Sequence, residues 1–388
     1  MRSPKERIEA VFPEIREIAH YIHEHPELGN QEFEACSRLT GLLEKHGFTV
    51  EKGVCGLETA FIASYKGEKP GPVIGFPAEY DALRGLGHAC GHNLIGTLAC
   101  LTAIAMKDAV DEYGGEVRVI GSPAEETMGA KCILAENGYY DDLACAIMGH
   151  PFGTHAASGM MAALDSQRFE FFGKSAHTGT APWDGVNALN AVIETFNGIN
   201  ALRQHVTPDA RVSGIIPNGG TVGNAVPDYA SCDFYIRANT SRYVHGFSEK
   251  IKNCARGAAL ATGCEVKITN FEGYYDDLHT NETLSARSMA HFREAAPDAV
   301  IREVDFGGSS DIGNVSYRCP TIHQLWDVTG DPAIGIHTNE FCAAADTDYA
   351  YEQMKLVAEA FVMTGEDALT QPEFVEAMRK EFVETTAM

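Results

Sequence analysis

The pattern of apolar residues changes twice along this chain, and that double change limits its possible folds more than any single motif does. Up to about residue 165, short apolar runs at residues 72–76, 116–120 and 143–148 alternate with stretches of helical periodicity. Such alternation predicts an α/β domain with a largely parallel sheet. A length of 388 residues also exceeds one ordinary core, so we expect two domains.

The middle of the chain follows a different order: strand, helix, strand, strand, helix, strand. This order is typical of a split βαβ unit of the ferredoxin-like type, which is complete in itself. Patterning of the βα kind resumes after it. We therefore predict a discontinuous catalytic domain of residues 1–165 and 275–388, with a βαββαβ domain inserted at residues 166–274.

Charge and composition exclude several classes of partner. The formal net charge of −24 disfavours nucleic acid and anionic membrane surfaces. No apolar signal core follows the charged start, and the apolar stretch at residues 94–106 falls short of the roughly 20 residues that a membrane helix needs. The eleven cysteines form no CxxC pair, which suits reduced thiols. We expect a cytoplasmic protein without nucleic-acid or membrane partners.

Polar side chains follow three of the predicted strands. Glu79 and Asp81 come after the first strand, Glu125 and Glu126 after the second, and His150 after the third. Ligands of open α/β sheets bind beyond the carboxyl ends of the strands. These side chains are therefore expected to meet at one rim of the sheet.

Cys90 and His92 precede the helix expected at residues 94–110 and add metal-binding chemistry to that rim. Thiolate and imidazole are good zinc ligands, and imidazole also suits manganese, cobalt and nickel. Gly91 between them suggests a turn that points both side chains at one ion. The plainer interpretation is a loop cysteine beside a surface histidine. No CxxC follows, which argues against a zinc ribbon or a cytidine-deaminase site.

The segment Ser122-Pro-Ala-Glu125-Glu126 has two interpretations. Ser122 as N-cap, Pro123 at the first helical position and Glu125 at the third would form a capping box of a helix over residues 125–137. Alternatively, one glutamate binds a metal while the other takes a proton from the attacking water, as a metal-dependent hydrolase requires. The two roles are compatible.

A series of motifs in fixed order resembles a known family. The motifs are His25-Pro-Glu-Leu-Gly, Glu79-Tyr-Asp-Ala-Leu, Gly87-His-Ala-Cys-Gly-His-Asn, Pro123-Ala-Glu-Glu, Gly149-His-Pro, Gly173-Lys-Ser-Ala-His, Asn224-Ala-Val-Pro, Asp311-Ile-Gly-Asn-Val-Ser and Gly335-Ile-His-Thr. Together they resemble the aminoacylase/carboxypeptidase-type dinuclear metallopeptidases. The resemblance is to the amidohydrolase branch, which contains hippurate, indole-acetyl-amino-acid and aminobenzoyl-glutamate hydrolases.

The resemblance implies two divalent metal ions per subunit, zinc, manganese, cobalt or nickel. Cys90 would bridge both ions, and the coordination would be completed by His92, Glu126, His150 and His337. His337 is an ordinary loop histidine by its local sequence and becomes a ligand only through the resemblance. Glu125 would be the general base and later the proton donor to the amine. Asp81 would contact the metal ligands without binding the ions itself.

The resemblance also implies a homodimer. The inserted domain would act as a lid and pair two subunits, so that His177 of one subunit polarises the scissile carbonyl in the other. Asn224 and Arg237 match positions that contact substrate, and Ser310 and Asp311 lie on a loop expected to line the pocket.

Two departures bear on the substrate. Glu79 and Asn93 stand where many members of the family have Asp, which resembles aminobenzoyl-glutamate hydrolase subunits and β-alanyl-lysine-type dipeptidases. We expect hydrolysis of a small amide that carries a carboxylate: an N-acyl amino acid, a dipeptide-like amide or an aminobenzoyl-glutamate-like compound. A dipeptidase or amidase for another small amide is the alternative within enzymes. An inactive metal-binding homologue that serves as a binding or assembly subunit is the alternative outside them, although an intact Glu125 argues against it.

Overall fold

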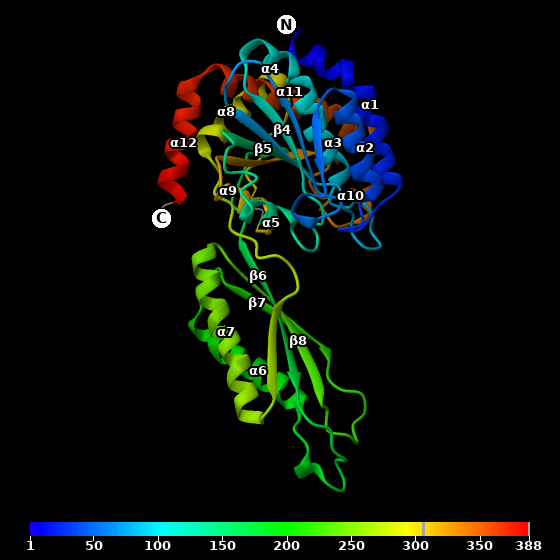
Figure 1. Cartoon of the computed structure of the whole chain (residues 1–388), viewed down its shortest axis with the longest axis vertical. Coiled ribbons are helices and arrows are strands. Elements are labelled where there is room, and N and C mark those ends of the chain that lie inside the picture. Colours follow the sequence, from blue (N-terminus) through cyan, green and yellow to red (C-terminus); the bar gives the residue numbers. More distant parts are fainter. Residues whose placement is uncertain (305–306, 387–388) are drawn as a thin grey trace. The chain divides into compact units, whose positions relative to one another are not determined.

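The computed structural model describes residues 1–304 and 307–386, and the chain forms two compact units (Figure 1). The first comprises Met1–Met160, Leu278–Gly307 and Asp311–Met388, and the second comprises Met161–Asp277 with Gly308–Ser310. The insertion was expected at residues 166–274, whereas this unit begins at Met161, runs to Asp277 and also includes Gly308–Ser310.

A six-stranded sheet organises the first unit, in the order β1-β2-β4-β3-β5-β10. The strands are β1 (Thr49–Lys52), β2 (Phe61–Lys66), β3 (Val73–Ala78), β4 (Glu116–Gly121), β5 (Cys145–Phe152) and β10 (Thr321–Asp327). β4, β3, β5 and β10 run parallel, whereas β2 is antiparallel to β4 and β1 is antiparallel to β2. The predicted α/β domain with a mostly parallel sheet is confirmed, and the antiparallel edge was not foreseen.

Helices surround this sheet (Figure 1). They are α1 (Pro4–Glu24), α2 (Phe33–Lys45), α3 (His92–Ala105), α4 (Lys107–Tyr113), α5 (Ala130–Glu136), α8 (Glu282–Ala295), α9 (Ile312–Ser316), α10 (Asn339–Ala344), α11 (Asp348–Thr370) and α12 (Pro372–Thr386). Helix α3 is buried along its whole length, packs on β3 and β5, and is covered by α1 and α11. By length and composition His92–Tyr113 would suffice to cross a membrane, but 89% of its apolar window is buried inside the protein, as in a core helix.

Two predicted helices differ from the structure. The helix expected at residues 94–110 is divided at Met106 into α3 and α4. The helix expected at residues 125–137 begins only at Ala130, because residues 122–129 form a turn in which Ala124 has a φ of 58°. The predicted capping box does not form: the Ser122 hydroxyl donates to the carbonyl of Ile120, 3.1 Å away.

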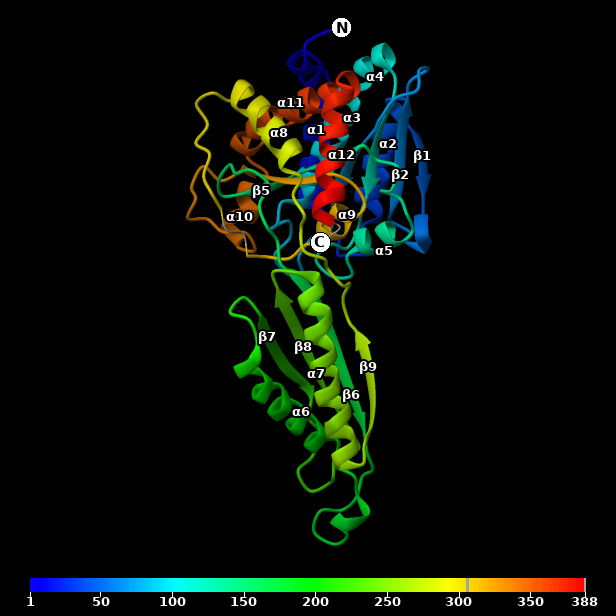
Figure 2. The same ribbon diagram turned by 90° about the vertical axis from the view of Figure 1, so that its left-hand side faces the viewer.

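The second unit is a four-stranded antiparallel sheet in the order β7-β8-β6-β9. Its elements are β6 (Ala163–Phe172), α6 (Ala188–Leu202), β7 (Arg211–Asn218), β8 (Tyr229–Ala238), α7 (Ser241–Thr262) and β9 (Glu265–Asn270). Helices α6 and α7 pack against each other and on the sheet (Figure 2). The βαββαβ order and this strand arrangement confirm the predicted ferredoxin-like fold.

Candidate metal centre

The predicted rim exists where the parallel strands of the first unit end. Glu79 follows β3 directly, and the turn with Glu125 and Glu126 follows β4. His150 was expected beyond its strand but lies within β5, which extends to Phe152. Three sequence segments therefore contribute side chains to one place.

Gly91 gives Cys90 and His92 a common direction. Its φ of 76° lies in the left-handed region, and a Cβ at this position would stand 2.8 Å from the Pro151 ring. The left-handed residue reverses the chain immediately before α3, as the sequence suggested. Ligand atoms of Cys90, His92 and His150 consequently lie within 4.8 Å of one another, and all three residues are buried.

Asp81 joins two of these segments. Its Oδ1 lies 2.9 Å from Nδ1 of His92, and its Oδ2 accepts the backbone N–H of Glu126 at 3.0 Å. Nε2 of His92 is buried and has no hydrogen-bond partner in residues 1–304 and 307–386. The Glu79 carboxylate lies 3.3 Å from this nitrogen without forming a hydrogen bond. A buried nitrogen that lacks a hydrogen bond costs free energy unless something binds it, and a metal ion is a partner that this donor set suits.

His150 and His337 approach Cys90 from other segments. Nδ1 of His150 lies 2.7 Å from the Pro151 carbonyl, and its Nε2 lies 3.4 Å from Sγ of Cys90. His337, with a φ of 63°, donates its backbone N–H to Ala89 at 2.8 Å, which anchors its loop beside Cys90. Cys90, Glu126 and His337 form a second group whose ligand atoms lie within 4.8 Å of one another.

Glu125 belongs to a third such group, with His92 and Glu126. The turn that carries it is fixed by Glu32, whose Oε1 accepts the N–H of Ala124 at 2.8 Å while its Oε2 accepts the Thr59 hydroxyl at 2.9 Å. A positive φ strains a residue that is not glycine, and such residues cluster at functional sites. The buried Glu32 was not among the sequence candidates, because a lone acidic residue before a helix gives no signal of such a contact.

A buried lysine lies next to the centre, and sequence reasoning missed it as well. Nζ of Lys131 lies 2.5 Å from Oε1 of Glu79 and 2.5 Å from Oδ1 of Asp311. Asp311 was expected to contact substrate. Its side chain is fully buried, and its two carboxylate oxygens bind the backbone N–H and the ammonium group of Lys131.

Burial sets the ionisation of these groups. It lowers the pKa of His150 to about 4, which keeps the imidazole in the neutral form that binds metals. It raises the pKa of the Cys90 thiol, an effect that a nearby cation would reverse. Burial, with Glu79 and Glu126 adding to it, raises the pKa of Glu125 well above that of an ordinary carboxyl group.

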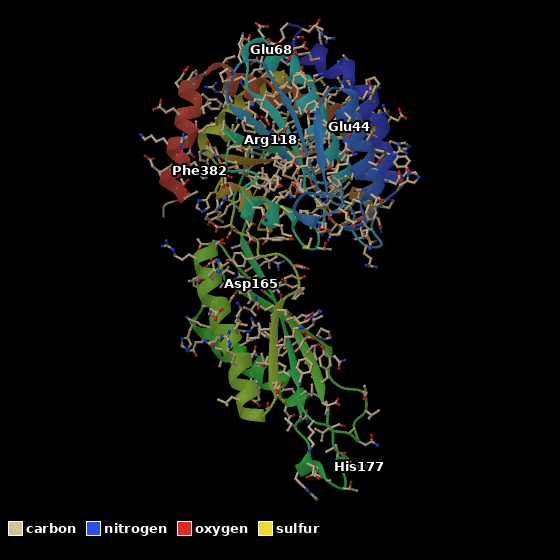
Figure 3. All side chains as sticks on the ribbon, in the orientation of Figure 1. Glu44, Glu68, Arg118, Asp165, His177 and Phe382 are labelled. Atoms are coloured by element: carbon tan, nitrogen blue, oxygen red, sulfur yellow. The ribbon has the colours of Figure 1, made fainter. Side chains whose placement is uncertain are left out.

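The remaining candidates belong to the second unit. His177 and Asn224 lie on two loops that pair with each other: His177 forms a β-bridge with Ala225, and the Thr178 N–H donates to the Asn224 carbonyl at 3.2 Å. Both side chains are exposed. Within this unit, His177 and Asp165 mark opposite ends (Figure 3).

Arg237 lies at the Asp165 end, because β8 places it opposite Leu164 of β6. Asn224 and Arg237 are therefore separated by the length of β8 within one subunit. Ser310 is buried and belongs to this same unit.

Comparison with known proteins agrees with this architecture. Residues 164–262 match the peptidase dimerisation domain family. The Xaa-Arg dipeptidase of Mus musculus is 33% identical over 396 residues, which cover 98% of this chain and 91% of the relative. One of the subunits of the p-aminobenzoyl-glutamate hydrolase of Escherichia coli is 34% identical over 314 residues, which cover 74% of this chain and 64% of the relative.

Solved structures show the same fold. The aminobenzoyl-glutamate utilization protein of Klebsiella pneumoniae has a TM-score of 0.73 at 19% identity, covering 93% of this chain and 98% of that chain. A dinuclear metal-binding peptidase of the M20 family from Bacillus subtilis has a TM-score of 0.67 at 21% identity, covering 94% of this chain and 99% of that chain.

The donor set, on an α/β domain with an inserted βαββαβ domain, defines a metallohydrolase that acts on carbon–nitrogen bonds of amides or peptides. The full-length similarity identifies the group within that class: the chain belongs to the M20 family of metallopeptidases and amidohydrolases.

Proposed function

We propose that the centre holds two divalent metal ions, bound by Cys90, His92, Glu126, His150 and His337. Two overlapping ligand groups share Cys90, which suits a bridging thiolate. The charge of the site supports the number of ions. Five carboxylates, the Cys90 thiolate and one ammonium group leave five negative charges in excess when all are ionised, and two divalent cations would neutralise four of them. The carboxylates and the ammonium group are those of Glu79, Asp81, Glu125, Glu126, Asp311 and Lys131.

The metals would supply one kind of chemistry: they lower the pKa of a water molecule, so that hydroxide is available near neutral pH. Glu125 then takes the proton of the attacking water and passes it to the leaving amine. Its raised pKa suits a group that must hold that proton between the two steps. Asp81 keeps Nδ1 of His92 engaged, so that Nε2 faces the metal.

We further propose a homodimer in which His177 donates a hydrogen bond to the developing oxyanion in the neighbouring subunit. The exposed position of His177 and the match to a dimerisation domain support this. β7 is an edge strand of the inserted sheet and exposes Ile215 (65%) and Ile216 (44%). An exposed apolar edge strand is a surface at which two sheets can join.

The substrate that we propose is a dipeptide or dipeptide-like amide with a free carboxylate. The full-length relative is named Xaa-Arg dipeptidase, and a net charge of −24 attracts a basic substrate. Asn224 of one subunit and Arg237 of the other are candidates for the substrate carboxylate, since one subunit does not bring them together.

Eleven free cysteines suit the predicted cytoplasmic location.

The observation that carries the proposal is the buried group of Cys90, His92 and His150, with Glu125 beside it. The test is to determine metal content and to measure hydrolysis of Xaa-Arg dipeptides, p-aminobenzoyl-glutamate and N-acetyl amino acids. We expect metal-dependent cleavage that is fastest for the basic dipeptides. Metal-loaded protein that cleaves none of these compounds would favour an inactive binding or assembly subunit instead, and preference for N-acetyl amino acids would favour a deacylase.

A further inference from the structure

Lys131 is unusual because its charge is completely removed from solvent. It lies at the second position of α5, a few residues beyond the turn that carries Glu125, and its side chain is 0% exposed. A buried ammonium group is costly unless it is paired and hydrogen-bonded. A buried lysine at this position therefore calls for a specific role of its charge.

The ammonium group connects three separate segments of the catalytic unit. Glu79 follows β3, Lys131 lies in α5, and Asp311 precedes α9. Besides the two ion pairs of 2.5 Å, the backbone N–H of Lys131 donates to Oδ2 of Asp311 at 3.0 Å. Both oxygens of Asp311 are therefore committed to Lys131, which fixes the orientation of that carboxylate.

The two partners of Lys131 stand beside the reacting groups. Oε2 of Glu79 lies 3.3 Å from Nε2 of His92, the nitrogen that faces the proposed metals. Oxygen atoms of Glu79, Glu125 and Asp311 lie within 4.8 Å of one another. Three carboxylates this close repel one another unless a cation lies among them. Lys131 is the cation that the described residues place there, and Glu125 also contributes to its electrostatic environment.

We propose that Lys131 is a positioning residue for the hydrolysis: by binding Glu79 and Asp311 it holds both carboxylates in place and thereby fixes the direction of the Glu125 carboxylate. This rests on the proposed function, in which Glu125 is the general base. Because the side chain of Lys131 is 0% exposed, the role proposed for it includes no contact with the substrate. Its contribution is geometric and acts through its two partners.

The test compares Lys131→Met and Lys131→Arg with wild type, by kcat and KM per metal-loaded site. Lys131→Met should keep its metal content and its KM, while kcat falls by about 100-fold, the effect expected of a misplaced catalytic group. Lys131→Arg should recover part of that loss, because a guanidinium group can also bridge two carboxylates.

Arg7→Met provides a matched control. Arg7 is 2% exposed and ion-paired with Glu366, so its loss also removes a buried cation, but at a position between α1 and α11 away from the rim. It should lower the melting temperature and leave kcat per folded site unchanged. If Lys131→Met lowers kcat no more than Arg7→Met does, or acts by losing metal, Lys131 is not a positioning residue.

Asp311→Asn keeps the proposal testable if Lys131→Met does not fold. It leaves the Lys131–Glu79 pair intact and should reduce kcat at unchanged KM, whereas a wild-type kcat would overturn the proposal. Glu125→Gln distinguishes a failure of the proposed function from a failure of the role assigned to Lys131. An active Glu125→Gln variant refutes the proposed function, and an inactive one beside fully active Lys131→Met and Asp311→Asn variants refutes only the role of Lys131.

Discussion

The Asp81 carboxylate lies 2.9 Å from Nδ1 of His92, and this contact decides which ring nitrogen of His92 faces the candidate centre. The other oxygen of Asp81 accepts the N–H of Glu126 at 3.0 Å. The buried carboxylate of Asp81 thus orients two proposed ligands, because it contacts the side chain of His92 and the backbone of Glu126. Although burial acts to raise the pKa of Asp81, the contacts with His92 lower it, so Asp81 stays ionised.

Replacing Asp81 should therefore weaken metal binding without removing a ligand. Asp81→Ala should lower metal affinity by about 10- to 100-fold, the usual effect of losing a carboxylate behind a metal-bound histidine. Asp81→Asn should lose less, because its carbonyl oxygen can still accept one hydrogen bond. Competition with a chelator measures both affinities. Wild-type affinity in Asp81→Ala would show that His92 does not depend on this contact.

Glu125→Gln should separate metal binding from chemistry. The amide has nearly the shape of the carboxylate but accepts no proton, so we expect normal metal content and a kcat lower by about 100- to 10,000-fold. Elemental analysis and steady-state kinetics on the same preparation provide the two readings. Loss of metal together with activity would instead make Glu125 a ligand.

Most of the fold followed from periodicity, and the errors have local physical causes. In helix α1 the local sequence and the structure agree: Ser3 and Glu6 form a capping box, and the buried face repeats at helical spacing. The segment Ser122–Glu125 carries the same capping signal and forms a turn instead. At that segment, a tertiary contact determines the conformation, because Glu32 accepts the Ala124 N–H. Glu32 lies far away in the chain, so the local sequence does not indicate this contact.

The residues of the site were likewise predicted in part and missed in part. Cys90, His92, Glu126, His150 and His337 were named from motifs and strand ends, and the structure brings their ligand atoms together in overlapping groups. Lys131 and Glu32 were missed because buried charged residues look like surface residues in a sequence. Their burial depends on pairing with segments far away in the chain, which no local pattern reports.

The pH dependence of stability should reveal Glu32. Burial raises the pKa of Glu32 from 4.5 to about 7, and Asp81 adds to the shift. Between these pH values the folded state binds more protons than the unfolded state, so this group's contribution is complete below pH 4.5 and is lost as the pH rises to 7. Glu32→Gln should flatten the fall in stability across that window, measured by denaturant unfolding at a series of pH values.

Glutamine suits this comparison because its carbonyl can accept from Ala124 while its amide donates to the Thr59 hydroxyl. Asp142→Asn is a useful contrast. Hydrogen bonding and charge from Arg118 lower the pKa of Asp142, so that stability is lost as the pH falls rather than as it rises. If Glu32→Gln shows the same slope as wild type between pH 4.5 and 7, Glu32 does not carry a raised pKa.

Mixed dimers should show whether His177 acts across subunits. His177→Ala and Glu125→Gln should each be nearly inactive alone, because one lacks the oxyanion donor and the other lacks the base. In a mixed dimer, the subunit with an intact Glu125 receives His177 from its neighbour, so one complete site forms. Random assortment makes half of the dimers mixed, and the activity should recover to about one quarter of wild type.

The recovery must come from subunit exchange, so its time course should follow the exchange measured with differently tagged chains. Mixing His177→Ala with the double variant Glu125→Gln, His177→Ala is the matched control, since no dimer in that mixture has His177 opposite an intact Glu125. Recovery in the first mixture alone requires action between subunits. No recovery after complete exchange places His177 in its own subunit's site, because each variant then lacks a component that its partner cannot supply.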